Sequence, residues 1–242
     1  MLQVCPNGAR SRVECAHLPV TAEELAVAAR EAVAAGAEDV HLHPKDHDGQ
    51  DTLEAAAVAA AVSAVRAAVP GVPVGVTTGA WATPDPRARA AQVRSWTVLP
   101  DHASVNWHED GASEVATALL DRGIGVEAGI YSGTAAARRF LDWPGARRVL
   151  RVLAEITEAA PQEALHAAAE LLDGLGSVPA PILLHGEDTA AWAVLRLAAS
   201  RGLDTRIGLE DVLHLPDGAP APGNAALVRA AREIIQDTPK RT

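Results

Sequence analysis

Two histidines separated by one residue, His41 and His43, have the strongest chemical signature in this sequence. They end a short apolar run that is typical of a β-strand, where residues i and i+2 share a face and lie roughly 6.6 Å apart along the chain. Two imidazoles at that spacing can both reach one metal ion, with Zn–N bonds of about 2.1 Å. The alternative is a pair of hydrogen-bonded histidines that bind no ion. Their position at the end of a strand favours the metal site.

An acidic pair, Glu210 and Asp211, follows a second predicted strand near the C-terminus. Because adjacent residues of a strand point to opposite sides, the two acids are expected to differ in role, one as a metal ligand and one as a base. Arg206, four residues before Glu210, could hold the second carboxylate ionised through its opposite charge. The alternative is that the two acids cap the segment that follows them.

These residues need a scaffold, and the hydrophobic pattern predicts one. Short β-branched runs alternate with longer Ala-rich amphipathic stretches, about 30 residues per unit, which is the length of a βαβ repeat. The expected strands are Leu2–Pro6, Val40–His43, Val72–Thr77, Ala103–Asn106, Gly125–Gly129, Val149–Ala154, Ile182–Leu184 and Thr205–Leu209. The expected helices are Ala22–Ala35, Leu53–Ala68, Pro86–Trp96, Ala112–Asp121, Thr134–Leu141, Gln162–Leu175, Thr189–Arg201 and Asn224–Ile235.

Eight such units predict an α/β protein with a closed (β/α)8 TIM barrel rather than an open doubly wound sheet. Thr21 and Glu24 form a capping box before the first helix, and Gly36, Gly123 and Gly202 each follow a helix end. The first strand lacks the glycine-rich dinucleotide fingerprint that would follow it in a Rossmann fold. With no linker in the pattern, we expect one domain over residues 1–242, with a short disordered tail from about residue 237.

Composition excludes several classes of function. The chain has 242 residues, of which 48% are hydrophobic and 21% charged, and its net charge is −10. Such an acidic protein is not expected to bind nucleic acid or an anionic membrane. The N-terminus lacks the basic and then apolar order of a signal peptide, and two cysteines, Cys5 and Cys15, are too few for a disulfide framework. We therefore expect a cytoplasmic protein.

A series of motifs resembles a known family across about residues 7–235. In order they are NGAR, LPVTAEEL, AAGAEDVHLHPKDHDGQDTL, VTTGAW, SVNWHE and RIGLEDVLHLPDGAPAPGNAALVRAA. They resemble the β-keto acid cleavage enzymes, the group that includes 3-keto-5-aminohexanoate cleavage enzyme. The HxHxxD motif after AGA and the RxGxED motif before a GN-containing helix start are specific to that family in this order and spacing.

The resemblance implies a zinc-dependent barrel that converts a β-keto acid and acetyl-CoA to acetoacetate and an acyl-CoA, and a homo-oligomer. It implies that His41, His43 and Glu210 bind Zn²⁺, that Asp211 is the catalytic acid/base, and that Arg206 holds Asp211. Further substrate contacts are expected around the barrel mouth. The expected substrate-binding residues are Thr77, Thr78, Gly79, Ser104, Asn106, Glu127 and Arg10.

The sequence departs from the family pattern at several points. Arg10 stands where relatives carry a glutamate near the metal, Ala80 replaces a second glycine, and the chain is shorter than the usual member. Two other functions fit part of the pattern. One is a zinc-dependent hydrolase of another carbonyl substrate, which would form product without CoA. The other is a non-catalytic barrel that binds a metabolite without turning it over.

Overall fold

Strands and α-helices alternate through residues 1–239, which are the residues that the computed structural model describes. The strands are β1 (Leu2–Val4), β2 (Asp39–Leu42), β3 (Val74–Val76), β4 (His102–Asn106), β5 (Gly125–Tyr131), β6 (Arg151–Ile156), β7 (Ile182–Gly186) and β8 (Thr205–Ile207). The helices are α1 (Ala22–Ala34), α2 (Ala55–Ala68), α3 (Pro86–Ser95), α4 (Ala112–Asp121), α5 (Ala136–Leu141), α6 (Pro161–Leu175), α7 (Ala191–Arg201) and α8 (Asn224–Asp237).

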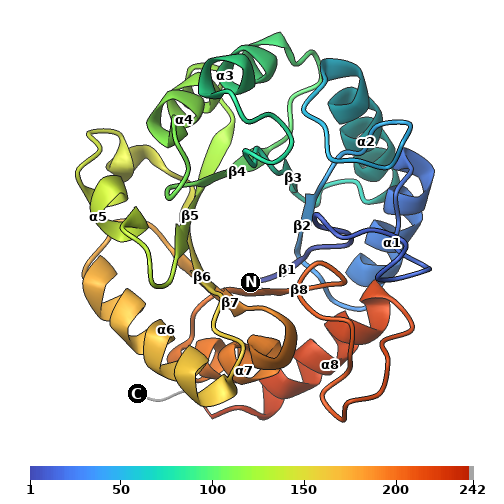
Figure 1. The fold of residues 1–242 in the computed structure, drawn as a ribbon. Helices are drawn as coiled ribbons and strands as arrows, with labels where there is room; N and C mark the ends of the chain where they lie inside the picture. Colours follow the sequence, from blue (N-terminus) through green and yellow to red (C-terminus); the bar gives the residue numbers. More distant parts are fainter. Residues whose placement is uncertain (240–242) are drawn as a thin grey trace.

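The strands are parallel, pair in chain order and form a barrel. Their order is β7-β6-β5-β4-β3-β2-β1-β8, and the helices surround them (Figure 1). The ring closes between β7 and β8 through a parallel bridge from Leu183 to Asp204, where the Leu184 amide donates to the Asp204 carbonyl at 2.9 Å. The predicted TIM barrel is therefore confirmed.

The element ends differ from the prediction mainly in the later part of the chain. The sixth strand begins at Arg151 instead of Val149, because a 3₁₀ helix over Ala146–Arg148 delays the extended backbone. Glu155 consequently lies within β6 and not beyond its end. The tail predicted from about residue 237 includes residues 240–242, which lie outside the described residues, whereas Asp237 ends α8.

The first helix begins where its capping residues predict. The Thr21 hydroxyl accepts a hydrogen bond from the Glu24 amide at 3.2 Å, and the Glu24 carboxylate accepts one from the Thr21 amide at 2.9 Å. This reciprocal pair satisfies two amides that the helix itself leaves without partners. Gly202 ends α7 with a φ of 67°, a left-handed conformation in which a larger side chain would be strained.

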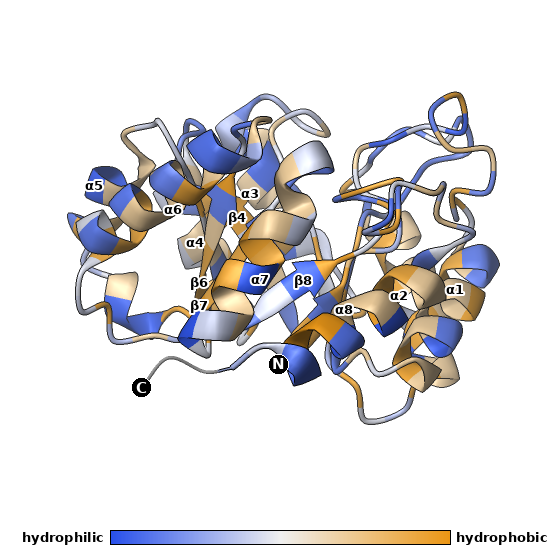
Figure 2. Ribbon diagram, turned by 90° about the horizontal axis from the view of Figure 1, so that it is seen from below, coloured by the Kyte–Doolittle hydropathy of each residue, from blue (hydrophilic) through white to orange (hydrophobic). Residues whose placement is uncertain are grey.

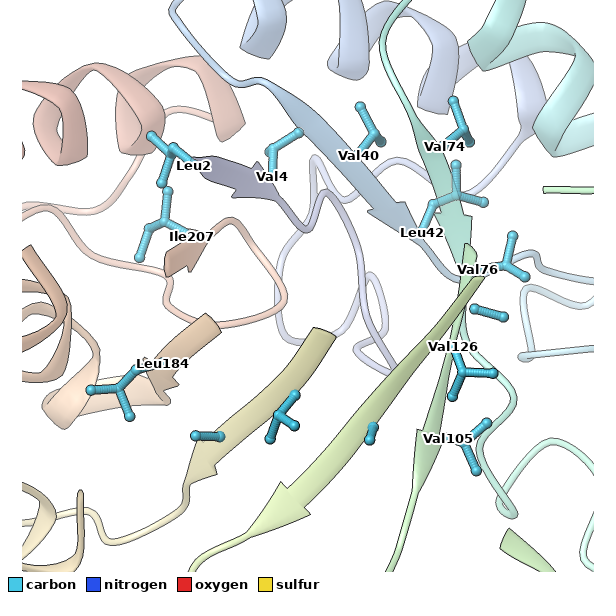
Figure 3. Packing of buried hydrophobic residues seen from close by; sticks show 14 of the residues in the cluster. Leu2, Val4, Val40, Leu42, Val74, Val76, Val105, Val126, Leu184 and Ile207 are labelled. Atoms are coloured by element: carbon cyan, nitrogen blue, oxygen red, sulfur yellow. The ribbon is translucent and has the colours of Figure 1, made fainter. Parts of the chain in front are cut away.

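Alternation along the strands separates an apolar outer face from a polar interior. Val40 and Val74 extend toward the surrounding helices, as Figure 3 shows, and belong to the buried hydrophobic core. On each strand, the residues next to these valines in sequence point into the barrel interior. Hydrophilic residues colour β8 in Figure 2, where Arg206 lies. Polar side chains in a barrel interior are costly unless they are paired with one another.

Two further expectations concern the chain as a whole. Within residues 1–239, no helix combines the length and the apolar character needed to cross a bilayer. Cys5 and Cys15 are both buried and both free thiols in the described part of the chain.

Candidate active site

Two histidines and one glutamate from opposite ends of the chain meet inside the barrel. One donor atom each from His41, His43 and Glu210 lies within 4.8 Å of the other two. His41 is on β2, His43 follows β2 directly, and the two imidazole centroids are 5.5 Å apart. The His43 Nε2 atom lies 3.6 Å from Glu210 Oε2. The spacing of the two histidines therefore positions both rings as the strand periodicity predicts.

Glu210 and Asp211 lie on a turn after β8 and not on the strand itself. β8 ends at Ile207, and the Asp211 and Val212 amides both donate to the Gly208 carbonyl at 3.0 Å. The chain turns here because Gly208 packs against the backbone of Cys5, whose carbonyl oxygen would lie 2.0 Å from an added Cβ. The expectation that the two acids point to opposite sides of a strand was therefore wrong. On the turn, both carboxylates can face Arg206.

Arg206 binds both acids at once. Its Nε donates to Asp211 Oδ1 at 3.0 Å, and one terminal nitrogen donates to Glu210 Oε1 at 2.9 Å. Burial raises the pKa of Glu210, but the guanidinium, followed by His43 and His41, lowers that pKa to about 2. Glu210 is consequently ionised at neutral pH. The second oxygens, Glu210 Oε2 and Asp211 Oδ2, are buried without a hydrogen-bond partner in residues 1–239.

A carboxylate that sequence reasoning missed, Asp51, holds His43 from behind. Asp51 Oδ2 lies 2.8 Å from His43 Nδ1, and the Trp81 indole donates to the same oxygen at 2.6 Å. The Lys45 ammonium pairs with Oδ1. Burial raises the pKa of Asp51, but His43 and Lys45 outweigh burial and hold that pKa well below its usual range. Its signal in the sequence is weak, since acids are common in exposed loops.

Glu127 does not reach the barrel mouth, where it was expected to contact substrate. It is fully buried beneath His41, with Oε2 3.6 Å from His41 Nδ1 and 3.0 Å from His102 Nδ1. Arg151 Nε lies 2.8 Å from its other oxygen. On the far side of the imidazole, His102 Nε2 lies 3.0 Å from Asp39 Oδ1. Glu127 thus belongs to an ion network that forms the floor of the site.

Two groups of donor atoms near His41 could hold a metal ion. Besides the group with His43 and Glu210, donor atoms of His41, His102 and Glu127 also lie within 4.8 Å of one another. Burial lowers the pKa of His102, but Glu127 and Asp39 outweigh it and raise the pKa to about 10. In this second group, Asp39 and Arg151 also bind His102 and Glu127, which favours the group with His43 and Glu210 as the candidate metal site.

The ion network on the floor gives the protein a pH-dependent stability. Because the pKa of His102 is raised from about 6.5 to about 10, its contribution is complete below pH 6.5 and is lost as the pH rises through 10. We expect His102→Gln to lower the free energy of unfolding by on the order of a few kcal/mol at pH 6, and by much less at pH 10.5.

Urea unfolding of both proteins at pH 6, 8 and 10.5 measures this difference. His166→Gln is a matched control, because that side chain is exposed on α6. A deficit of His102→Gln that is equal at all three pH values would contradict the assignment of a charged imidazole.

Comparison with known families identifies the type of enzyme. The model of the family "beta-keto acid cleavage enzyme" (BKACE) matches residues 1–241. The chain belongs to the BKACE family. None of the curated proteins matches this sequence.

Solved structures that resemble this BKACE chain share its fold at low sequence identity. Apo ObcA has a TM-score of 0.72 and 18% identity, and the alignment covers 93% of this chain and 64% of ObcA. A ternary complex of ObcA with a C4-CoA adduct and oxalate has a TM-score of 0.68 at 18% identity, covering 91% and 64%. A 3-dehydroquinate dehydratase from Geobacillus kaustophilus HTA426 has a TM-score of 0.59 at 11% identity, covering 97% and 89%. The chain thus spans about two thirds of the length of ObcA, at 64%.

The loop after β3 carries three of the residues expected to bind substrate in this BKACE chain. Thr77 Oγ1 accepts a hydrogen bond from the Gly79 amide at 3.1 Å. The Thr78 hydroxyl points away and donates to the Ser104 carbonyl at 2.6 Å. The next amide, of Ala80, donates to both oxygens of Glu109 at 3.0 Å. One backbone amide of this loop, that of Ala80, therefore binds a carboxylate. Thr77 lies in the same loop and binds the Gly79 amide.

Ser104 and Asn106 share one face of β4 and are both buried. The Asn106 amide nitrogen donates to Glu109 Oε1 at 3.0 Å, so the amide oxygen is its free acceptor. That oxygen and Glu155 Oε1 both approach Gly129 on β5, lying 2.7 and 2.6 Å from the point that a Cβ would occupy. The absence of a side chain at Gly129 lets these two acceptors enter the barrel.

Gly129→Ala is therefore expected to impair catalysis with little loss of stability. The added methyl group would displace two flexible side-chain ends inside the site, and misplaced contacts of this kind cost rate more than folding energy. We expect kcat/KM to fall by about tenfold. Steady-state kinetics measures it, with Gly174→Ala as the control, because no heavy atom lies within 4 Å of a Cβ added there. Equal kcat/KM values for the two variants would contradict the expectation.

Arg10 and the buried His185 lie beside Glu210 and Asp211, respectively. Arg10 donates to the Glu210 carbonyl at 3.0 Å and to Asp188 Oδ1 at 2.6 Å, so its guanidinium bridges two loops beside the candidate metal site. His185 Nδ1 lies 3.4 Å from Asp211 Oδ1. Burial and Arg206 lower the pKa of His185, but the nearby carboxylates of Asp211 and Glu155 outweigh them and raise it to about 9.

Proposed function

We propose that this BKACE chain is a zinc-dependent enzyme that converts a β-keto acid and acetyl-CoA to acetoacetate and the CoA thioester of the remaining acyl group. One observation carries the proposal. Donor atoms of His41, His43 and Glu210 lie within 4.8 Å of one another, and Arg206 links Glu210 to Asp211. The proposal therefore assigns a cation site and a buried base to neighbouring side chains.

The donor set fits zinc. It consists of two imidazoles and one carboxylate, the type of set that leaves a coordination position open for substrate. The buried Glu210 Oε2 has no hydrogen-bond partner in the described residues, and it points toward His43 Nε2. When bound, zinc would supply a Lewis acid that polarises the keto group of the substrate.

Asp211 is suited to the role of base. Oδ1 is held by Arg206, which leaves the buried Oδ2 to take a proton. Low solvent access strengthens its interaction with a bound substrate. We assign to it the removal of the proton between the carboxylate and the keto group of the β-keto acid.

The bond changes balance without a further reactant. The resulting carbanion attacks the acetyl thioester and expels the CoA thiolate, which forms one carbon–carbon bond. The thiolate then attacks the original keto carbon, and the bond between that carbon and its neighbour breaks. Acyl-CoA leaves, and Asp211 returns its proton to the second carbanion to give acetoacetate. The ObcA complexes with oxaloacetate and with a C4-CoA adduct support a β-keto acid and a CoA thioester as the reactants.

We assign the substrate carboxylate to Thr77 in the loop after β3. Thr77 Oγ1 accepts from the Gly79 amide, which leaves the hydroxyl hydrogen to donate to the carboxylate. Ser104 and Asn106 would then lie beside the acyl chain. We expect Arg10, which donates to the Glu210 carbonyl and to Asp188, to contact an anionic group of the substrate or of CoA.

A panel of β-keto acids incubated with the zinc-loaded enzyme tests the proposal. Acetoacetate and the matching acyl-CoA are expected in equal amounts, and only when acetyl-CoA is present. Formation of product from a carbonyl substrate without CoA would instead favour a zinc hydrolase. Tight binding of a metabolite without turnover of any panel member would favour a non-catalytic barrel.

A further inference from the structure

One of the two histidines of the metal site is fixed from three directions. His43 Nδ1 lies 2.8 Å from Asp51 Oδ2, on the side of the ring away from Glu210. The Trp81 indole is stacked on the imidazole, with centroids 5.8 Å apart and planes inclined by 16°. The backbone of His43 is held by the Asn7 side chain, which donates to the His43 carbonyl at 2.8 Å and accepts from its amide at 3.0 Å.

Asp51 itself is held so that it cannot turn away. The Trp81 indole donates to Asp51 Oδ2 at 2.6 Å, and the Lys45 ammonium pairs with Oδ1. Lys45 in turn donates to the Gly8 carbonyl at 2.7 Å. Trp81 reaches this position because Gly79 beneath it lacks a side chain, since a Cβ there would lie 2.2 Å from the indole.

The contact with Asp51 determines which ring nitrogen of His43 carries the proton. A carboxylate is an acceptor, so the nitrogen beside it, Nδ1, is the donor. The lone pair of the neutral ring is then on Nε2, which faces Glu210 Oε2 at 3.6 Å. Carboxylates that orient metal-binding histidines in this way typically change metal affinity by about 10- to 100-fold when they are removed.

Among residues 1–239, no side chain clamps His41 in the way that Asp51 holds His43. The His41 Nδ1 atom lies 3.6 Å from Glu127, a longer contact than the 2.8 Å of His43, and Glu127 is shared with His102 and Arg151. Orientation of the metal site thus depends most strongly on the loop that carries Asp51.

We propose that Asp51 is the positioning residue of the metal site, holding His43 with Nε2 toward the ion, and that Trp81 keeps Asp51 and His43 aligned. This inference rests on the proposed zinc centre. Asp51 contacts neither the ion nor the substrate and acts through His43.

Metal affinity tests the proposal independently of activity. Zn²⁺ is titrated against a chromophoric chelator in the presence of the wild type, Asp51→Asn, Asp51→Ala and, as control, Asp48→Ala, whose exposed carboxylate lies in the same loop. We expect a loss of about 10-fold for Asp51→Asn and of up to about 100-fold for Asp51→Ala. Asn is milder because its amide oxygen can still accept from Nδ1. Asp48→Ala should bind like the wild type.

A second readout separates orientation from a general loss of structure. Co²⁺ in place of Zn²⁺ should give a visible spectrum in Asp51→Asn that is shifted from the wild type, while circular dichroism remains the same. If Asp51→Ala does not fold, Asp51→Asn, which retains the volume and an acceptor, carries the test.

The outcomes distinguish a failure of the proposed zinc centre from a failure of the role assigned to Asp51. If the wild type binds no Zn²⁺, the proposed metal centre is refuted and the role of Asp51 with it. If the wild type binds Zn²⁺ tightly and both Asp51 variants match Asp48→Ala in affinity and Co²⁺ spectrum, the role of Asp51 alone is refuted.

Discussion

Asp211→Asn is expected to lower the rate of acetoacetate formation by about 10³-fold while zinc stays bound. Asn has the shape of Asp and can still accept from Arg206 through its oxygen, as Asp211 does at 3.0 Å. It cannot take the proton that the carbanion must lose. A coupled assay of acetoacetate measures the rate, and elemental analysis measures zinc.

The control for this variant removes a carboxylate far from the barrel mouth. Asp173 is exposed near the end of α6, and Asp173→Asn should retain the activity of the wild type. Turnover by Asp211→Asn within a factor of two of the wild type would remove Asp211 from the role of base. Loss of zinc together with activity would instead make Asp211 part of the metal site.

His41→Ala is expected to abolish metal binding and activity together. The wild type should hold about one Zn²⁺ per chain, as a set of two imidazoles and a carboxylate does. Removal of one ligand should weaken affinity by more than about 100-fold, since loss of an orienting residue alone can reach that value. Elemental analysis after dialysis measures the metal content.

His47→Ala is the matched control, because that imidazole is exposed and lies in the same segment of the chain. It should keep its zinc and its rate. Retention of one equivalent of zinc by His41→Ala, with affinity unchanged, would exclude His41 as a ligand. The donor group of His41, His43 and Glu210 would then have to be abandoned.

Much of the architecture could be predicted from local patterns. Strand periodicity placed His41 and His43 on one face, and the capping box at Thr21 marked the start of α1. Both signals involve residues within four positions of each other, where backbone geometry dominates. Element ends were less predictable. A 3₁₀ helix before β6 moved that strand by two residues and brought Glu155 into the barrel wall.

The residues that the sequence did not reveal are those whose partners lie far away along the chain. Asp51 is one loop carboxylate among several until Lys45, Trp81 and His43 converge on it. Glu127 was expected at the barrel mouth. Its depth in the barrel is set by the register of β5 against β6, which pairs it with Arg151.

For this protein, the amino-acid order alone determined the eight repeats, the HxH pair and the acid–arginine segment, because each depends on spacing within one element. The tertiary structure decided that Glu210 and Asp211 both face Arg206, since the turn at Gly208 depends on packing against Cys5. It also decided the environment of His102. The carboxylates of Asp39 and Glu127, which raise the pKa of His102 to about 10, come from other strands.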